Sequence, residues 1–127
     1  MNQHKPSNLY SLLDLIRDKP ELYIGNKSLT TLYNNINGYN LYCFVNAIKE
    51  DLIPDLAEFH DFVALQLNYS ESTSGYRNMI LEKNNFDEEE SLKAFYYLLN
   101  LFKNSITITN NYEIRRLQKE FHQSNHK

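Results

Sequence analysis

The chain of 127 residues has a single cysteine, only three glycines and three prolines, and no tryptophan. Cys43 cannot form a disulfide within the chain, which is typical of a reducing compartment, and we expect the cytoplasm. Three glycines are too few for the glycine-rich loops that cradle nucleotide phosphates. No apolar run reaches the roughly 18 residues of a membrane span, and the first residues lack the apolar segment of a signal peptide. We therefore expect no membrane partner.

What the chain does have is a globular composition, with 42% hydrophobic residues and ten tyrosines. Its length predicts one domain, residues 1–127, large enough to bury a core. The net charge of −3 disfavours nucleic acid as a partner, because such proteins usually present a basic face, and it suits a basic protein. Tyrosine is favoured at protein interfaces, although tyrosines also border ordinary cores with the hydroxyl in water.

Apolar residues recur at helical spacing along most of the chain, which predicts a mostly α-helical bundle of five to six helices with its core at about 8–103. The predicted helices span about 7–18, 28–50, 55–67, 87–103 and 111–122. The segment 76–83 fits either a helix or a strand. Alternating Ile and Thr favour extended chain at 105–109, and the polar residues 123–127 are predicted to be disordered.

The stretch from Arg17 to Lys49 contains a turn followed by a long apolar helix, around which we expect the rest of the chain to pack. Pro20 cannot continue the first helix, and Gly25 suits a turn that needs a positive φ angle. The apolar residues between them are expected to fold back onto the core. After Ser28, a favourable N-cap, apolar residues cover most sides of the next helix, which predicts a central position in the bundle. Gly38 within that helix suggests a close helix crossing.

Two groups of acidic residues are candidates for binding a basic partner. The first group follows the break in the chain near Pro54, and most of it shares the polar side of one predicted helix. The second group lies in the first turn of a later helix, where acidic side chains also complement the helix dipole. An ordinary solvated face is the alternative interpretation of both groups. They consist of Asp51, Asp55, Glu58 and Asp61, and of Glu88, Glu89 and Glu90.

The sequence shows no nucleophile–base pair, and we expect no enzyme activity and no cofactor. One enzyme alternative remains: Arg116 and His122 have the spacing of the R-x4–6-H motif of HEPN-type helical ribonucleases. The residues His122 and His126 are four apart, which is metal-ligand spacing on a helix, but no acidic or cysteine ligand is placed to complete a site. We therefore expect no bound metal.

The pattern around the turn resembles a family of small bacterial proteins. It reads Arg17-x-x-Pro20-x-x-Tyr23-Ile24-Gly25, followed by Ser28-Leu29, Leu32, Ile36 and Gly38-Tyr39. The resemblance extends over roughly residues 8–103 and departs after residue 105. The family looks like immunity proteins of contact-dependent or polymorphic toxin systems. The resemblance implies a protein that binds the cognate toxin's C-terminal domain and occludes its active site. A regulatory protein-binding module is the second alternative, and the oligomeric state stays open.

Overall fold

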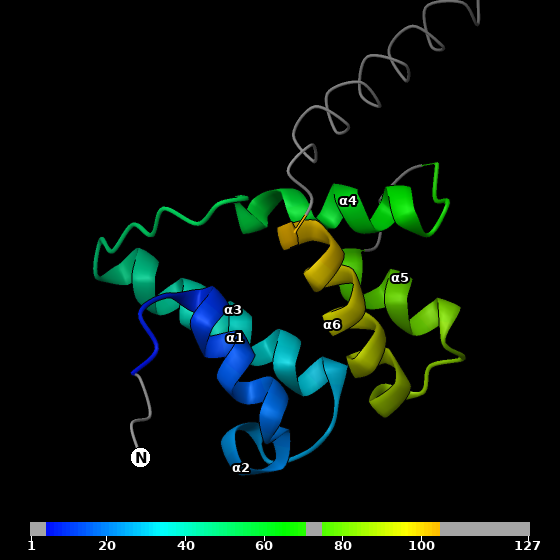
Figure 1. Cartoon of the computed structure of the whole chain (residues 1–127), viewed down its shortest axis with the longest axis horizontal. Coiled ribbons are helices and arrows are strands. Elements are labelled where there is room, and N and C mark those ends of the chain that lie inside the picture. Colours follow the sequence, from blue (N-terminus) through cyan, green and yellow to red (C-terminus); the bar gives the residue numbers. More distant parts are fainter. Residues whose placement is uncertain (1–4, 71–74, 105–127) are drawn as a thin grey trace, which may run out of the picture.

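The computed structural model describes residues 5–70 and 75–104, and within them the chain forms a helical bundle without strands (Figure 1). This confirms the predicted mostly α-helical fold, and it assigns the ambiguous segment 76–83 to a helix. The predictions for 105–109, 111–122 and 123–127 lie outside the described residues. In chain order the elements are α1 (Leu9–Asp18), α2 (Pro20–Ile24), α3 (Leu29–Val45), the 3-10 helix η1 (Leu56–Glu58), α4 (Phe59–Gln66), α5 (Gly75–Lys83) and α6 (Glu88–Asn104).

Short polar residues begin the helices, as the sequence indicates. The Asn8 side chain accepts a hydrogen bond from the backbone amide of Ser11 at 2.9 Å, and the Ser11 hydroxyl accepts one from the amide of Asn8, which completes a capping box. Ser28 caps α3 by accepting from the amide of Thr31 at 3.1 Å. Each cap satisfies backbone donors that a helix leaves free at its first turn.

The turn after α1 contains a helix that the sequence analysis did not predict. Lys19 leaves helical angles, but Pro20 then occupies the first position of α2, where its missing N–H costs nothing. Gly25 ends α2 in the left-handed region, with φ +93°. The prediction that this connector folds entirely onto the core was wrong, since Leu22 is 68% exposed and only Ile24 packs against the buried cluster.

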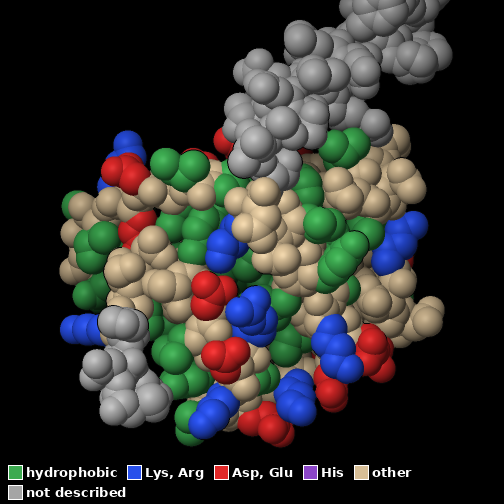
Figure 2. All heavy atoms as spheres, viewed as in Figure 1, with side chains coloured by type: hydrophobic (Ala, Val, Ile, Leu, Met, Phe, Trp, Pro, Cys, Tyr) green, Lys and Arg blue, Asp and Glu red, His purple; other side chains and the backbone are tan. Residues whose placement is uncertain are grey.

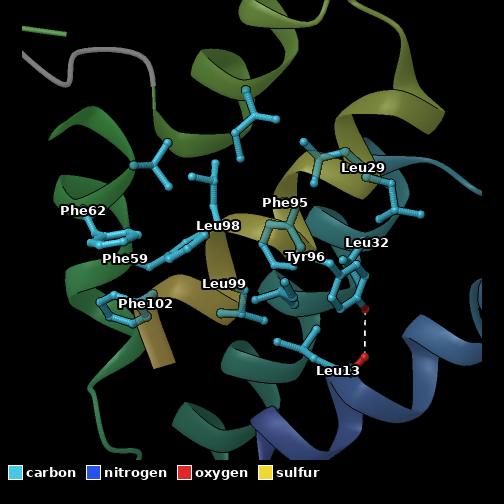
Figure 3. Close-up of a cluster of buried hydrophobic side chains, with 14 of the residues drawn as sticks. Leu13, Leu29, Leu32, Phe59, Phe62, Phe95, Tyr96, Leu98, Leu99 and Phe102 are labelled. Carbon is cyan, nitrogen blue, oxygen red and sulfur yellow. Dashed lines mark hydrogen bonds between the residues drawn. The ribbon is translucent and has the colours of Figure 1, made fainter. Parts of the chain in front are cut away.

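The centre of the bundle is α6, which lies against α3, α4 and α5 (Figure 1). It also reaches α1, because the buried hydroxyl of Tyr96 donates a 2.8 Å hydrogen bond to the backbone oxygen of Leu13 (Figure 3). Its apolar side chains recur at helical spacing, so that one broad face meets three neighbours. The buried apolar residues of α6 are Leu92, Phe95, Tyr96, Leu98, Leu99 and Phe102.

Aromatic rings fill the middle of this core (Figure 3). Phe59, at the start of α4, is fully buried and touches rings from three helices. Its ring centroid lies 5.2 Å from that of Tyr76, 5.4 Å from Phe102, 5.5 Å from Phe95 and 6.4 Å from Phe62. Three of these contacts are edge-to-face, an arrangement that the quadrupoles of aromatic rings favour.

The helix α3 does not occupy the central position that its apolar content predicted. Only Leu29, Leu32 and Ile36 are buried, all within its first half. The later members of the same face, Tyr39 and Cys43, are only partly buried. The helix also ends at Val45 rather than near residue 50. The core therefore covers one side of half of α3, and the rest of the helix projects beyond it.

The close helix crossing expected at Gly38 is also absent among the described residues. A Cβ atom added at this position meets nothing within 4 Å. We therefore expect Gly38→Ala to raise the free energy of unfolding by about 0.5–1 kcal/mol, because alanine loses less backbone entropy in a helix. Urea denaturation followed by circular dichroism measures the change.

The matched control is the same substitution at Gly25, where the added Cβ also has open space but φ is +93°. Gly25→Ala should destabilise the protein by about 1 kcal/mol, because the left-handed conformation is costly for any L side chain. A destabilising Gly38→Ala would mean that something packs against this part of α3 after all.

Candidate partner-binding surface

The last two turns of α3 expose large apolar side chains to solvent. Leu41 is 62% exposed, Phe44 is 80% exposed and Val45 is 70% exposed, and Ile48 just beyond the helix is 45% exposed. We call these four residues the outer stripe. The spacing of i, i+3 and i+4 places Leu41, Phe44 and Val45 on one side of α3, and Ile48 follows just beyond the end of the helix. Figure 2 shows apolar side chains mixed with acidic ones at the left end of the molecule, where Figure 1 places the end of α3 and the loop after it.

The outer stripe is not a continuation of the core face. At 3.6 residues per turn, Leu41 lies about half a turn around α3 from the line through Leu32 and Ile36. The earlier residues on this outer side, such as Asn34 and Asn37, are polar and exposed. The helix therefore carries two apolar faces, an inner one buried in its first half and an outer one exposed in its second half.

Backbone geometry at the end of α3 fixes the position of the outer stripe. The amide of Ile48 donates a 2.8 Å hydrogen bond to the backbone oxygen of Cys43, and the amide of Ala47 donates to that of Phe44 at 3.2 Å. Ala47 adopts a φ of +54°, the left-handed conformation usual at a helix C-terminus, although glycine is the common residue there. These bonds stop the helix and hold Ile48 beside its last turn.

The loop that follows α3 is tied to α1 through Glu50 and Tyr10, and to α3 itself through Tyr39. Glu50 accepts a 3.0 Å hydrogen bond from the amide of Leu9, at the start of α1, and another from the hydroxyl of Tyr39. The hydroxyl of Tyr10 donates to the backbone oxygen of Pro54. The hydrogen bond to Glu50, with burial, raises the pKa of Tyr39, so the phenol keeps its proton to a higher pH than an ordinary tyrosine does.

The first predicted acidic group lies in and after this loop. Asp51, Asp55 and Asp61 are exposed, and Glu58 is partly buried. Asp55 also has a structural role, because its side chain caps η1 by accepting from the amide of Ala57 at 3.0 Å. Burial raises the pKa of Tyr10, and the negative charges of Asp55 and Glu58 raise it further.

The second predicted acidic group is divided between the fold and the surface. Glu88 is partly buried and accepts hydrogen bonds from residues of α3, Glu90 forms an exposed ion pair with Lys93 at 3.1 Å, and Glu89 is exposed. An exposed pair of this kind contributes at most about 1 kcal/mol. Of the three residues in the second group, Glu88 is therefore the one that is partly buried and hydrogen-bonded within the bundle.

An apolar groove of about 510 Å³ lies between α1, α2 and the first half of α3. Leu12, Ile24 and Ile36 are among its lining residues, and it ends at Tyr39, two residues before the outer stripe begins. The lining also includes Asn34, which lies on the outer side of α3, so the groove and the outer stripe are separated along the helix and not by its sides.

The residues considered for catalysis or metal binding all belong to the C-terminal part of the chain. Arg116, His122 and His126 lie outside the described residues. Among residues 5–70 and 75–104, no group of three His, Cys, Asp or Glu side chains is placed to hold a metal ion. No helix in this part of the chain is long and apolar enough to cross a membrane.

Comparisons with protein-family models, with curated proteins and with solved structures found no match for this chain. The resemblance to immunity proteins therefore rests only on the residues that carry it. Two of them have a clear structural reason in this fold, since Pro20 begins α2 and Gly25 ends it in the left-handed region. The same geometry would suit any protein with this turn, so it supports the turn and not a particular function.

Sequence reasoning missed the outer stripe as a candidate site. It noted apolar residues on more than one side of the helix and interpreted them as burial on all sides. Asn34 and Asn37 lie about two turns and one turn before Leu41 on the same side of the helix, and both are polar. They indicate that this side faces solvent, because a helix side that begins with polar residues normally does.

Proposed function

We propose that this chain is an immunity protein that binds a cognate bacterial toxin domain in the cytoplasm and neutralises it by occluding the toxin's active site. The observation that carries this proposal is the outer stripe, a row of large apolar side chains in solvent on a well-formed helix. Contiguous exposed apolar surface of this kind typically marks a protein-interaction site. The turn from Arg17 to Gly25, with its resemblance to immunity proteins, directs that general conclusion towards a toxin partner.

The charges and aromatic residues nearby support the same proposal. Exposed carboxylates such as Asp51 and Asp55 would accelerate the encounter with a basic toxin surface and would favour that partner over others. The aromatic side chains of Tyr42, which is 60% exposed, and Phe44 would supply buried anchors in the complex. Occlusion needs no cofactor, because a standard interface of about 800 Å² per partner is enough to cover an active site.

Coexpression tests the proposal directly. The chain is produced together with the toxin domain encoded immediately upstream of it, and growth and complex formation are measured. We expect restored growth and a stable complex that survives gel filtration. Full toxicity without a complex would reject the proposal. A regulatory module would instead leave the toxin active and bind an unrelated protein.

A further inference from the structure

We infer that the outer stripe of α3 is the inserted helix of a helix-in-groove interface, and that it docks into an apolar groove on the partner protein whose rim carries Lys and Arg side chains. The inference rests on the proposed function, because the toxin domain is the partner that would present this groove. It goes further by naming the contacting surface, the manner of contact and the chemistry of the partner's site.

The geometry of the outer stripe favours a groove over a flat partner surface. On α3, Leu41, Phe44 and Val45 have the i, i+3 and i+4 spacing of the anchors by which one helix occupies a hydrophobic groove. The projecting end of α3 leaves Leu41, Phe44 and Val45 at least 60% exposed. Tyr42 beside them is exposed to a similar degree, so apolar surface extends around one edge of the helix.

The helix is also held rigidly before any partner arrives. Its first half is buried through Leu29, Leu32 and Ile36, and its last turn is closed by the hydrogen bond from Ile48 to Cys43. The Tyr39–Glu50 hydrogen bond fixes the chain just after it. Because this helix is already ordered, binding costs little conformational entropy, and more of the favourable contact energy contributes to affinity.

The charge distribution predicts the rim of the partner's groove. Residues 40–61 contain five carboxylates and one lysine, which gives this segment a charge of −4, whereas the whole chain carries −3. The remainder of the chain is therefore slightly positive, and the negative charge is concentrated in the segment that carries the end of α3. Lys and Arg around the groove would meet this charge. A second copy of the same chain would bring like charges together, which opposes self-association through this face.

The test compares two exposed aromatic residues on equally long helices. Phe44→Glu places a charge in the outer stripe, and Tyr97→Glu places one on α6, where Tyr97 is 66% exposed. Affinity for the upstream-encoded toxin domain is measured by calorimetry. We expect Phe44→Glu to weaken binding by about 30-fold or more, as the loss of an interface anchor does, and Tyr97→Glu to change it less than about 3-fold. Raising the salt concentration should slow association of the wild type, because the rim charges are then screened.

A cysteine placed in the outer stripe, Val45→Cys in a Cys43→Ser background, reports on what covers this face, because the chain's only native cysteine lies on the inner face of α3. Alkylation of the introduced cysteine should slow when the toxin domain binds. If Phe44→Glu binds as tightly as the wild type, the inference is wrong and the proposed function stands. If the wild type does not bind the toxin domain, both fall. If alkylation slows as the concentration of the chain alone rises, a second copy occupies the outer stripe. If alkylation becomes faster after truncation at Asn104, the chain's own C-terminal segment occupies it. Either result overturns the inference.

Discussion

Replacing Phe59 by alanine should lower the free energy of unfolding by about 3–5 kcal/mol, the usual cost of removing a fully buried phenylalanine ring. This ring is in contact with four others and joins α4 to α5 and α6. Its loss would leave a cavity that the neighbouring rings cannot fill without leaving their favoured rotamers. Since a domain of this size is stable by only about 5–15 kcal/mol, the effect is a large share of the total.

Urea denaturation measures this loss, with Phe44→Ala as the matched control. Phe44 is also a phenylalanine in a helical segment, but it is 80% exposed, so its truncation should change stability by less than about 0.5 kcal/mol. If Phe59→Ala does not fold, Phe59→Leu gives the same test with a smaller expected loss of about 1–2 kcal/mol. A loss below 1 kcal/mol for both Phe59 variants would show that the aromatic cluster is not the main source of stability.

Most of the fold could be predicted because its determinants are local. A capping residue and the apolar spacing that follows it are both readable within about ten residues, and this is how Ser28, Asp55 and the helix from Glu88 were found. The short helix after Lys19 was missed, because a proline read as a helix stop is equally good as a helix start.

The position of α3 could not be predicted, because periodicity shows which residues share a face and not what covers that face. Leu41, Phe44 and Val45 form as regular a stripe as Leu29, Leu32 and Ile36 do. Only the second set meets the core. The difference arises because the other helices pack on one side of α3, and Leu41 lies about half a turn around the helix from that side.

The candidate site was predicted in part for a similar reason. The carboxylates near Asp51 and Asp55 are on the surface, as their polar surroundings indicate. The role of Glu88 depends on Thr30 and Ser28, which lie 58 and 60 residues away in the sequence, and no local pattern reports such a pairing. Its three hydrogen bonds within the fold lead to a sharp prediction about stability.

Glu88 joins the N-termini of two helices with one carboxylate. It begins α6, and its Oε1 accepts hydrogen bonds from the amide of Thr30 at 2.8 Å and the hydroxyl of Ser28 at 3.0 Å. Its Oε2 accepts a third, at 2.6 Å, from the Thr30 hydroxyl, which also accepts a 3.2 Å hydrogen bond from Arg77 of α5. A negative charge is favoured here because both helix dipoles point their positive ends at it.

We therefore expect Glu88→Gln to lower the free energy of unfolding by about 2 kcal/mol at neutral pH, since charge-assisted hydrogen bonds are worth more than neutral ones. The control is Glu89→Gln, which removes the same charge from the next, exposed residue and should cost less than about 0.5 kcal/mol. If both substitutions cost the same, the effect would come from net charge and not from the contacts of Glu88.

The pH dependence distinguishes the charge of Glu88 from its shape. Burial raises the pKa of Glu88, but hydrogen bonds from Thr30 and Ser28 and the charge of Arg77 prevail and lower it below the ordinary value of 4.5. A carboxyl whose pKa is lower in the folded state stabilises the fold fully above its unfolded pKa, and it loses that stabilisation as the pH falls through the folded pKa. The advantage of the wild type over Glu88→Gln should therefore be constant from pH 7 to about pH 5 and shrink below 4.5. An advantage that stayed constant down to pH 3 would show that the geometry of the side chain, and not its charge, holds α3 to α6.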